Sequence, residues 1–236
     1  MRHSNAKKVT NTTKRVTTNN IQKCNFELRH IQPIGFAQNR AFKEYEKGQH
    51  LTLHGYAGSG KTLISMYLAL DSIENNEYTK LIIVRSAVPV RDQGFLPGNL
   101  EEKAAVLETP YQAICNDLYH RDDAYITLKN RGTIEFLTTS YIRGITINDA
   151  IIFIDEASSC NEHEISSILT RCGDNCRIIV SGDYRQSDLE KDFEKQGFIK
   201  ALKRLKKMKE VSFVEFGIED ICRSEFVKSW ILSEFD

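Results

Sequence analysis

The chain has 236 residues, of which 41% are hydrophobic and 27% are charged, and its 32 basic residues balance its 32 acidic ones. This composition is typical of an ordinary folded domain, and the formal net charge of zero excludes a protein whose whole surface attracts polyanions. Apolar runs fall short of the roughly 20 residues that a membrane span needs, so no membrane partner is expected. The six cysteines lack the spacing of a disulfide framework, which favours reduced thiols and a cytoplasmic location.

Residues 1–25 are expected to form a flexible basic N-terminal tail. Asn, Thr, Lys and Arg dominate this segment, and the first acidic residue of the chain is Glu27. Such a composition buries too little apolar surface to fold. The tail either stays solvated without a partner or tethers a nucleic acid through its positive charge. Residues 26–236 are expected to form a single domain.

Short apolar strands alternate with helices from Phe26 onward. Strands are expected at 51–54, 81–84, 133–137, 150–154, 177–181 and 211–216. Helices are expected at 62–73, 100–118, 162–170 and 198–208. Continuous apolar strands separated by helices are typical of a mainly parallel sheet with both faces covered. The pattern therefore predicts an α/β fold, built as a three-layer αβα sandwich.

A phosphate-binding pattern follows the first expected strand. It fits G-x-x-x-x-G-K-[ST] at every fixed position and consists of Gly55, Tyr56, Ala57, Gly58, Ser59, Gly60, Lys61 and Thr62. Its glycines let backbone N–H groups surround a phosphate. Lys61 would reach the β- and γ-phosphates of a nucleotide such as ATP, and the Thr62 hydroxyl would ligate Mg²⁺. The strand before the pattern and the helix after it, whose N-terminus favours anions, argue against a chance glycine-rich loop.

Two adjacent acids follow the strand expected at 150–154. Asp155 stands at the carboxyl end of that strand, where open α/β sheets bind ligands, and it would hold Mg²⁺ together with Thr62. Glu156 would polarise the attacking water as a general base. Small-molecule kinases usually lack the second acid, so the pair favours nucleotide hydrolysis. The alternative is two solvated acids at a strand end.

A further polar strand end follows the strand expected at 177–181. In the additional-strand branch of P-loop enzymes, this strand lies between the two strands that carry the lysine and the aspartate. Gln186 or Asp183 would then sense the γ-phosphate. Gly182-Asp183 is also a common turn sequence, so the spacing by itself leaves both readings open.

Taken together, these motifs resemble the PhoH family of ATPases, which are relatives of the superfamily 1 helicase core. The resemblance runs from about Gln38 to Val227 and includes the segments GFLPGNLEEK at 94–103, YIRGITINDA at 141–150 and EDICR at 219–223. It implies a RecA-like P-loop domain that hydrolyses ATP and acts on RNA or single-stranded nucleic acid as a helicase-like motor. It also implies a homo-oligomer, with a hexameric ring as one form.

The resemblance further implies that Gln38 reads the adenine edge of ATP, since its amide is both donor and acceptor. The chain departs from the family pattern at 85–93, which is one residue shorter, and at Ile145, which replaces a usual arginine. Both departures fall where the family would contact nucleic acid or a neighbouring subunit. They bear on the substrate more than on ATP hydrolysis.

Phosphoryl transfer needs positive charge at the γ-phosphate. Superfamily 1 helicases supply it from a second RecA-like domain, whereas this chain has one, so an arginine from a neighbouring subunit is expected. Arg143 and Arg223 are the first candidates, because they lie in matched segments, and Arg185 is the next. Each is equally well explained as a surface ion pair. The basic run at 200–209 would bind phosphates or stay solvated.

Two functions remain open from the sequence. A nucleic-acid-coupled motor predicts ATP hydrolysis that single strands stimulate. An ATP-dependent switch predicts slow turnover without strand separation and a nucleotide-dependent affinity for a protein partner.

Overall fold

One parallel sheet organises the chain, in a computed structural model that describes residues 26–86, 100–142, 144–183 and 193–233. Six strands lie in the order β3-β2-β4-β5-β1-β6. They are β1 (His50–Gly55), β2 (Lys80–Arg85), β3 (Ile134–Thr138), β4 (Ala150–Ile154), β5 (Cys176–Gly182) and β6 (Val211–Phe216). All six expected strands are confirmed, and β5 lies between β1 and β4 as expected.

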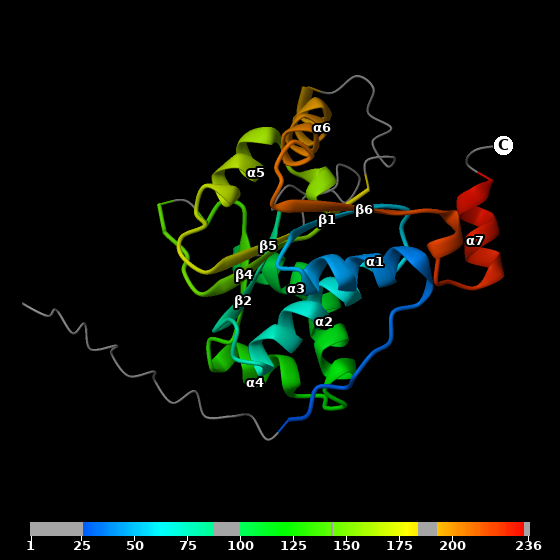
Figure 1. Cartoon of the computed structure of the whole chain (residues 1–236). Coiled ribbons are helices and arrows are strands. Elements are labelled where there is room, and N and C mark those ends of the chain that lie inside the picture. The colour runs from blue at the N-terminus through cyan, green and yellow to red at the C-terminus, as the bar shows by residue number, and fades with distance from the viewer. Residues whose placement is uncertain (1–25, 87–99, 143, 184–192, 234–236) are drawn as a thin grey trace, which may run out of the picture.

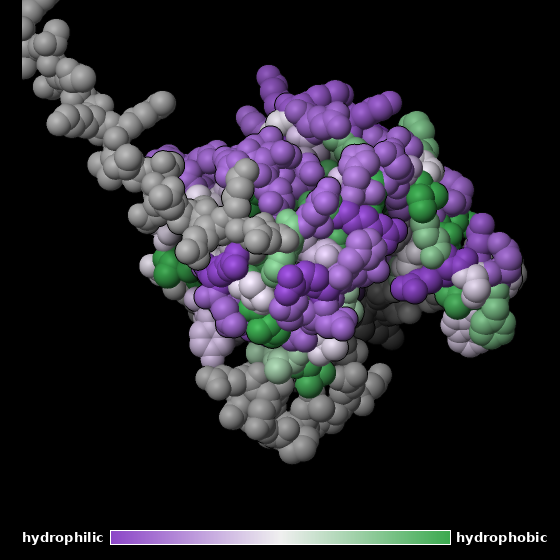
Figure 2. Space-filling view, turned by 90° about the horizontal axis from the view of Figure 1, so that it is seen from below, coloured by the Kyte–Doolittle hydropathy of each residue, from purple (hydrophilic) through white to green (hydrophobic). Residues whose placement is uncertain are grey.

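Helices cover both faces of this sheet (Figure 1). The helices are α1 (Gly35–Glu46), α2 (Lys61–Glu74), α3 (Leu100–Leu118), α4 (Ala124–Asn130), α5 (Glu162–Leu169), α6 (Phe193–Leu205) and α7 (Glu225–Leu232), with short 3-10 turns η1 (Ala157–Ser159) and η2 (Ile218–Asp220). Helices α1 to α4 form the lower layer in Figure 1, α5 and α6 form the upper layer, and α7 lies at one end of the molecule. This is the expected RecA-like three-layer αβα sandwich. Seen from below, the outer surface of the lower layer is mainly hydrophilic (Figure 2).

Side-chain alternation along the strands produces two separate cores. In β1, Leu51 and Leu53 pack into the core between the sheet and α1 to α4, so Thr52 between them faces the layer of α5 and α6. In β4, Phe153 belongs to the lower core and Ile152 to the upper one. The strands whose ends form the site therefore carry side chains of both cores.

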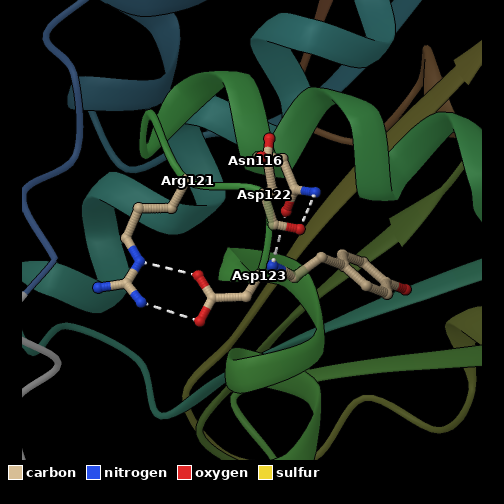
Figure 3. Close-up of polar contacts among 5 residues, drawn as sticks. Asn116, Arg121, Asp122 and Asp123 are labelled. Carbon is tan, nitrogen blue, oxygen red and sulfur yellow. Dashed lines mark hydrogen bonds and ion pairs between the residues drawn. The ribbon is translucent and has the colours of Figure 1, made fainter.

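A hydrogen-bonded turn fixes α4 against the end of α3 (Figure 3). Asn116 donates from Nδ2 to the carbonyl oxygen of Asp122 (2.6 Å), and its Oδ1 accepts from the backbone N–H of Tyr125 (3.0 Å). Arg121 pairs with both carboxylate oxygens of Asp123, at 2.8 Å each. This turn braces the C-terminal end of α3, and the C-terminal half of that helix contributes to the functional site.

The sequence pattern did not predict the helices α1, α4 and α7, and it placed the bounds of α6 wrongly. Helix α1 buries mainly small residues such as Ala37 and Ala41, which give a weak apolar period. The helix expected at 198–208 runs instead from Phe193 to Leu205. Beyond it the chain tightens into i→i−3 hydrogen bonds, from Met208 N–H to the Leu205 carbonyl among others, so Met208 leaves the helix. Within the described ranges, no helix is long and apolar enough to cross a membrane.

Candidate functional site

A pocket of about 600 Å³ opens at the carboxyl ends of β1, β4 and β5. This is the edge at which open α/β sheets bind ligands. The phosphate-binding pattern lines one side of the pocket, and Glu156 and Asp183 contribute from the ends of β4 and β5. Helix α3 and the segment before α7 complete the lining, the latter through Arg223. The fold therefore brings four sequence segments together at one pocket: the phosphate-binding loop, the acidic residue after β4, the end of β5 and the segment that carries Arg223.

The loop between β1 and α2 takes a conformation that depends on glycine. Gly55 has a φ of 126°, and a Cβ atom there would lie 2.1 Å from the Phe216 carbonyl oxygen. Gly58 has a φ of 75°, and a Cβ atom there would lie 2.8 Å from Cγ of Arg223. Gly60 caps α2 without a side chain to accept from its first N–H groups. Those N–H donors therefore remain suited to an anion.

Lys61 is held inside this loop. Its ammonium group donates to the carbonyl oxygens of Gly55 (2.9 Å) and Tyr56 (2.6 Å) and to the Ser59 hydroxyl (3.3 Å). Burial lowers the pKa of Lys61, against the opposing effect of the acids around it. The partners within hydrogen-bonding distance are neutral, so an anion in the pocket would supply the missing counter-charge.

Two hydroxyl groups from separate helices, those of Thr62 in α2 and Tyr111 in α3, converge at the carboxylate of Asp155. The Thr62 hydroxyl donates to its two oxygens at 3.3 and 3.2 Å, and the Tyr111 hydroxyl donates to Oδ2 at 2.9 Å. Asp155 is only 4% exposed, and burial raises its pKa, while the Tyr111 hydrogen bond and the charge of Arg85 lower it. Its close partners are neutral hydroxyl groups, which leaves the buried negative charge suited to a cation.

Glu156 directs its side chain into the pocket from an unusual backbone conformation. Its φ and ψ of 49° and 42° lie in the left-handed region, which non-glycine residues rarely adopt and which often occurs at functional sites. Burial raises the pKa of Glu156, as does the neighbouring Asp155, while Arg85 and Lys61 lower it. Of the two adjacent acids, Asp155 is hydrogen-bonded to Thr62 and Glu156 lines the pocket.

Gln38 and Arg223 lie against the loop in the same chain. Gln38 is buried, accepts from the backbone N–H of Ile34 (2.7 Å) and donates to the Ser59 carbonyl oxygen (3.2 Å). The backbone N–H of Cys222 donates to the Gly58 carbonyl oxygen (3.0 Å), which places the Arg223 side chain across Gly58. Both residues thus border the loop, although both amide ends of Gln38 already have partners within the chain.

The remaining sequence candidates, Arg143, Arg185 and Gln186, lie outside the described residues. Conversely, the sequence analysis missed Tyr111 and Arg85. Tyr111 lies on the face of α3 that meets the site, and only its helical spacing from the pocket-lining Ile114 and Asp117 carries a signal. Arg85 is the last residue of the apolar strand β2, and Asp155 directly follows the apolar strand β4. A charged residue at the carboxyl end of a buried strand is the sequence signal that the two share.

Sequence comparisons give the family. The model described as PhoH-like protein matches residues 30–235. A PhoH-like protein of Synechocystis sp. is 33% identical over 195 residues, covering 82% of this chain and 58% of that protein. Protein PhoH of Escherichia coli (strain K12) is 33% identical over 204 residues, covering 84% of this chain and 57% of that protein. The chain thus spans a little over half the length of these relatives.

A structural comparison agrees at the level of the fold. The large terminase from a thermophilic bacteriophage superposes with a TM-score of 0.55 at 14% sequence identity, covering 87% of this chain and 51% of that chain. At this identity the likeness concerns the fold alone. Because the family model matches residues 30–235 and the relatives are 33% identical, the chain belongs to the PhoH-like protein family.

Proposed function

We propose that this chain hydrolyses ATP to ADP and phosphate with the help of Mg²⁺, and couples hydrolysis to RNA or single-stranded nucleic acid. The observation that carries the proposal is the convergence of Lys61, Thr62, Asp155 and Glu156 at one pocket. These groups supply a cation for the phosphates, oxygen ligands for a metal and a base for water. Membership of the PhoH-like family supports the same reaction.

The proposed chemistry assigns one task to each group. The N–H groups at the start of α2 and the Lys61 ammonium bind the β- and γ-phosphates. Glu156 orients a water molecule and accepts its proton as the water oxygen attacks the γ-phosphorus and the bond to the β-phosphate oxygen breaks. The raised pKa of Glu156 brings this base closer to the working pH. Gln186 remains the proposed sensor of the γ-phosphate, and Gln38 the proposed adenine contact.

The residues present fit Mg²⁺. The Thr62 hydroxyl and the Asp155 carboxylate face each other at 3.2–3.3 Å, and Mg²⁺ prefers such oxygen ligands with few protein groups and several waters. When bound, the ion would neutralise developing charge on the phosphate oxygens. Tyr111 would keep the carboxylate in place for this purpose.

Coupling to nucleic acid is supported by the charge of one exposed edge. Exposed basic residues gather at the end of α6 and the turn after it, namely Lys200, Lys203, Lys206, Lys207 and Lys209. Positive side chains along one edge suit a phosphate backbone. A homo-oligomeric ring, with a hexamer as one form, would complete the site from outside. We keep Arg143 as a candidate for an arginine acting across subunits, whereas the position of Arg223 beside Gly58 favours action within its own chain.

The test is phosphate release from ATP with and without single-stranded RNA and DNA, beside a Glu156→Gln variant. Stimulation that disappears in the variant supports the coupled motor and identifies the strand. Slow, unstimulated release that Glu156→Gln still abolishes supports ATP hydrolysis and rejects the coupling, in favour of the switch. Release that the variant leaves unchanged rejects the proposed base.

A second experiment separates the two modes of arginine action. A Lys61→Ala chain is mixed with an Arg223→Ala chain, each inactive alone. Recovered hydrolysis would mean that one subunit supplies the arginine to another, whereas continued inactivity at concentrations where subunits associate favours action within one chain.

A further inference from the structure

A second pocket is lined by helices α5 and α6. These helices cover the opposite face of the sheet from α2 (Figure 1). The volume of the pocket is about 380 Å³, which falls within the roughly 300–1,000 Å³ of small-molecule sites. Strands β1, β5 and β6 form the floor, and the walls are apolar, with Ile165 and Leu169 from α5 and Leu205 from α6. None of these side chains takes part in the proposed ATP site.

The floor of this pocket holds a buried hydroxyl group. Thr52 is 1% exposed, and its Oγ1 atom has no hydrogen-bond partner among the described residues. Thr52 is adjacent to Val180 of β5 in the sheet register, and both side chains belong to the face that meets α5 and α6. An unpaired buried hydroxyl costs stability, so its position in a pocket points to a ligand group that completes it.

The polar groups around the hydroxyl are uncharged. His50 accepts at Nδ1 from the backbone N–H of Ile178 (3.0 Å), and burial lowers the pKa of His50, which favours the neutral ring. Burial raises the pKa of Cys172 to about 12, so that thiol keeps its proton. The charges of Glu162 and Arg204 pair with each other across the two helices at 3.5 Å. Apart from this pair at the rim, the described lining residues offer a ligand no charged partner.

We propose that this pocket binds a small, neutral, largely apolar molecule whose one polar group hydrogen-bonds to Thr52. The apolar walls supply most of the binding through burial, and the hydroxyl fixes the orientation. The Glu162–Arg204 pair at the rim is exposed and therefore weak, so it does not seal the entrance. The strands of the floor end at Gly55 and Gly182, so the site sits on the same strands as the ATP pocket without sharing its residues.

Phenol and toluene test the proposal, because they differ only by a hydroxyl in place of a methyl group. Methyl-detected NMR of the full chain follows Ile165, Val180 and Leu205 during titration with each compound. Both compounds should shift these three resonances. The affinity for phenol relative to toluene should fall roughly 2- to 12-fold in Thr52→Val, as expected for the loss of one hydrogen bond. The experiment needs no nucleotide, so its outcome is independent of the proposed ATP hydrolysis.

Two filling variants check the location from opposite walls, Ala201→Phe on α6 and Ser166→Phe on α5. At least one that still unfolds cooperatively should lose the shifts for both compounds. Thr52→Val should melt at the same temperature as the parent or higher, because it removes an unpaired hydroxyl.

Three results would overturn the proposal. The first is the absence of shifts up to the solubility of both compounds. The second is unchanged binding in a folded filling variant. The third is a change of the same resonances with protein concentration alone, which would mean that another copy of the chain fills the pocket.

Discussion

Replacing Tyr111 by phenylalanine would remove a single hydroxyl from the site and keep the ring that packs α3 against the sheet. The hydroxyl donates to Asp155 Oδ2 at 2.9 Å in a fully buried position. A hydrogen bond to a charged group is worth about 1.5–3 kcal/mol. In a domain of this size, that loss lowers the melting temperature by roughly 3–12 °C. Because Asp155 would lose one of the groups that orient it, half-maximal hydrolysis should need about 10- to 100-fold more Mg²⁺.

Tyr125→Phe is the matched control. Its hydroxyl donates to the buried carboxylate of Glu108 at 2.6 Å, in the contact between α3 and α4 and away from the pocket. Thermal unfolding should show a similar loss of stability in both variants, whereas Mg²⁺ titrations of ATP hydrolysis should shift only in Tyr111→Phe. An equal shift in both, or none in Tyr111→Phe, would refute the assigned role of Tyr111.

Three further outcomes are expected. Lys61→Met should abolish ADP binding in calorimetry. Its melting temperature should stay within a few degrees of the parent's, because the change removes a buried cation together with its hydrogen bonds to neutral acceptors. A folded variant that still binds ADP would contradict the assignment of Lys61 to the phosphates. Gln38→Ala should destabilise the chain by about 1–3 kcal/mol in denaturant unfolding, since the Ser59 carbonyl oxygen loses a buried donor. An unchanged midpoint would show that the contact is dispensable. Burial disfavours protonation of His50 in the folded state, so the unfolded chain binds more protons below about pH 6.5. The free energy of unfolding should therefore fall by up to about 1.4 kcal/mol for each unit by which the pH is lowered in this range. His50→Asn should flatten that slope relative to the parent chain.

The sequence predicted those parts of the fold and site that depend on local pattern. Strand β4 was placed at its observed bounds, because a continuous apolar run that ends on an acid has few other interpretations. The loop from Gly55 to Thr62 was equally clear, since its glycines and lysine occur at fixed spacing. Local pattern also sufficed for α3, even though Pro110 lies inside it.

What the sequence left out depends on contacts between distant segments. The hydroxyl of Tyr111 reaches Asp155 only when α3 packs over the end of β4. Likewise, Arg223 was expected to act on a neighbouring subunit, and its contact with Gly58 of its own chain emerges from the hydrogen bond between Cys222 and the loop. Helix α4 has only seven residues, too few for an apolar period to stand out.

The strand order has a consequence for folding during synthesis on the ribosome. Strand β1 is synthesised first, but it pairs only with β5 and β6, and Leu51 meets its partner Ile179 128 residues later. At about 5–20 residues per second, synthesis of that stretch takes roughly 6–25 s. During this interval β2, β3 and β4 can already pair with one another, whereas β1 has no strand to pair with and its apolar side chains stay exposed. We expect the nascent chain to depend on chaperones most strongly in this window, and the phosphate-binding loop to be among the last parts to reach its native form.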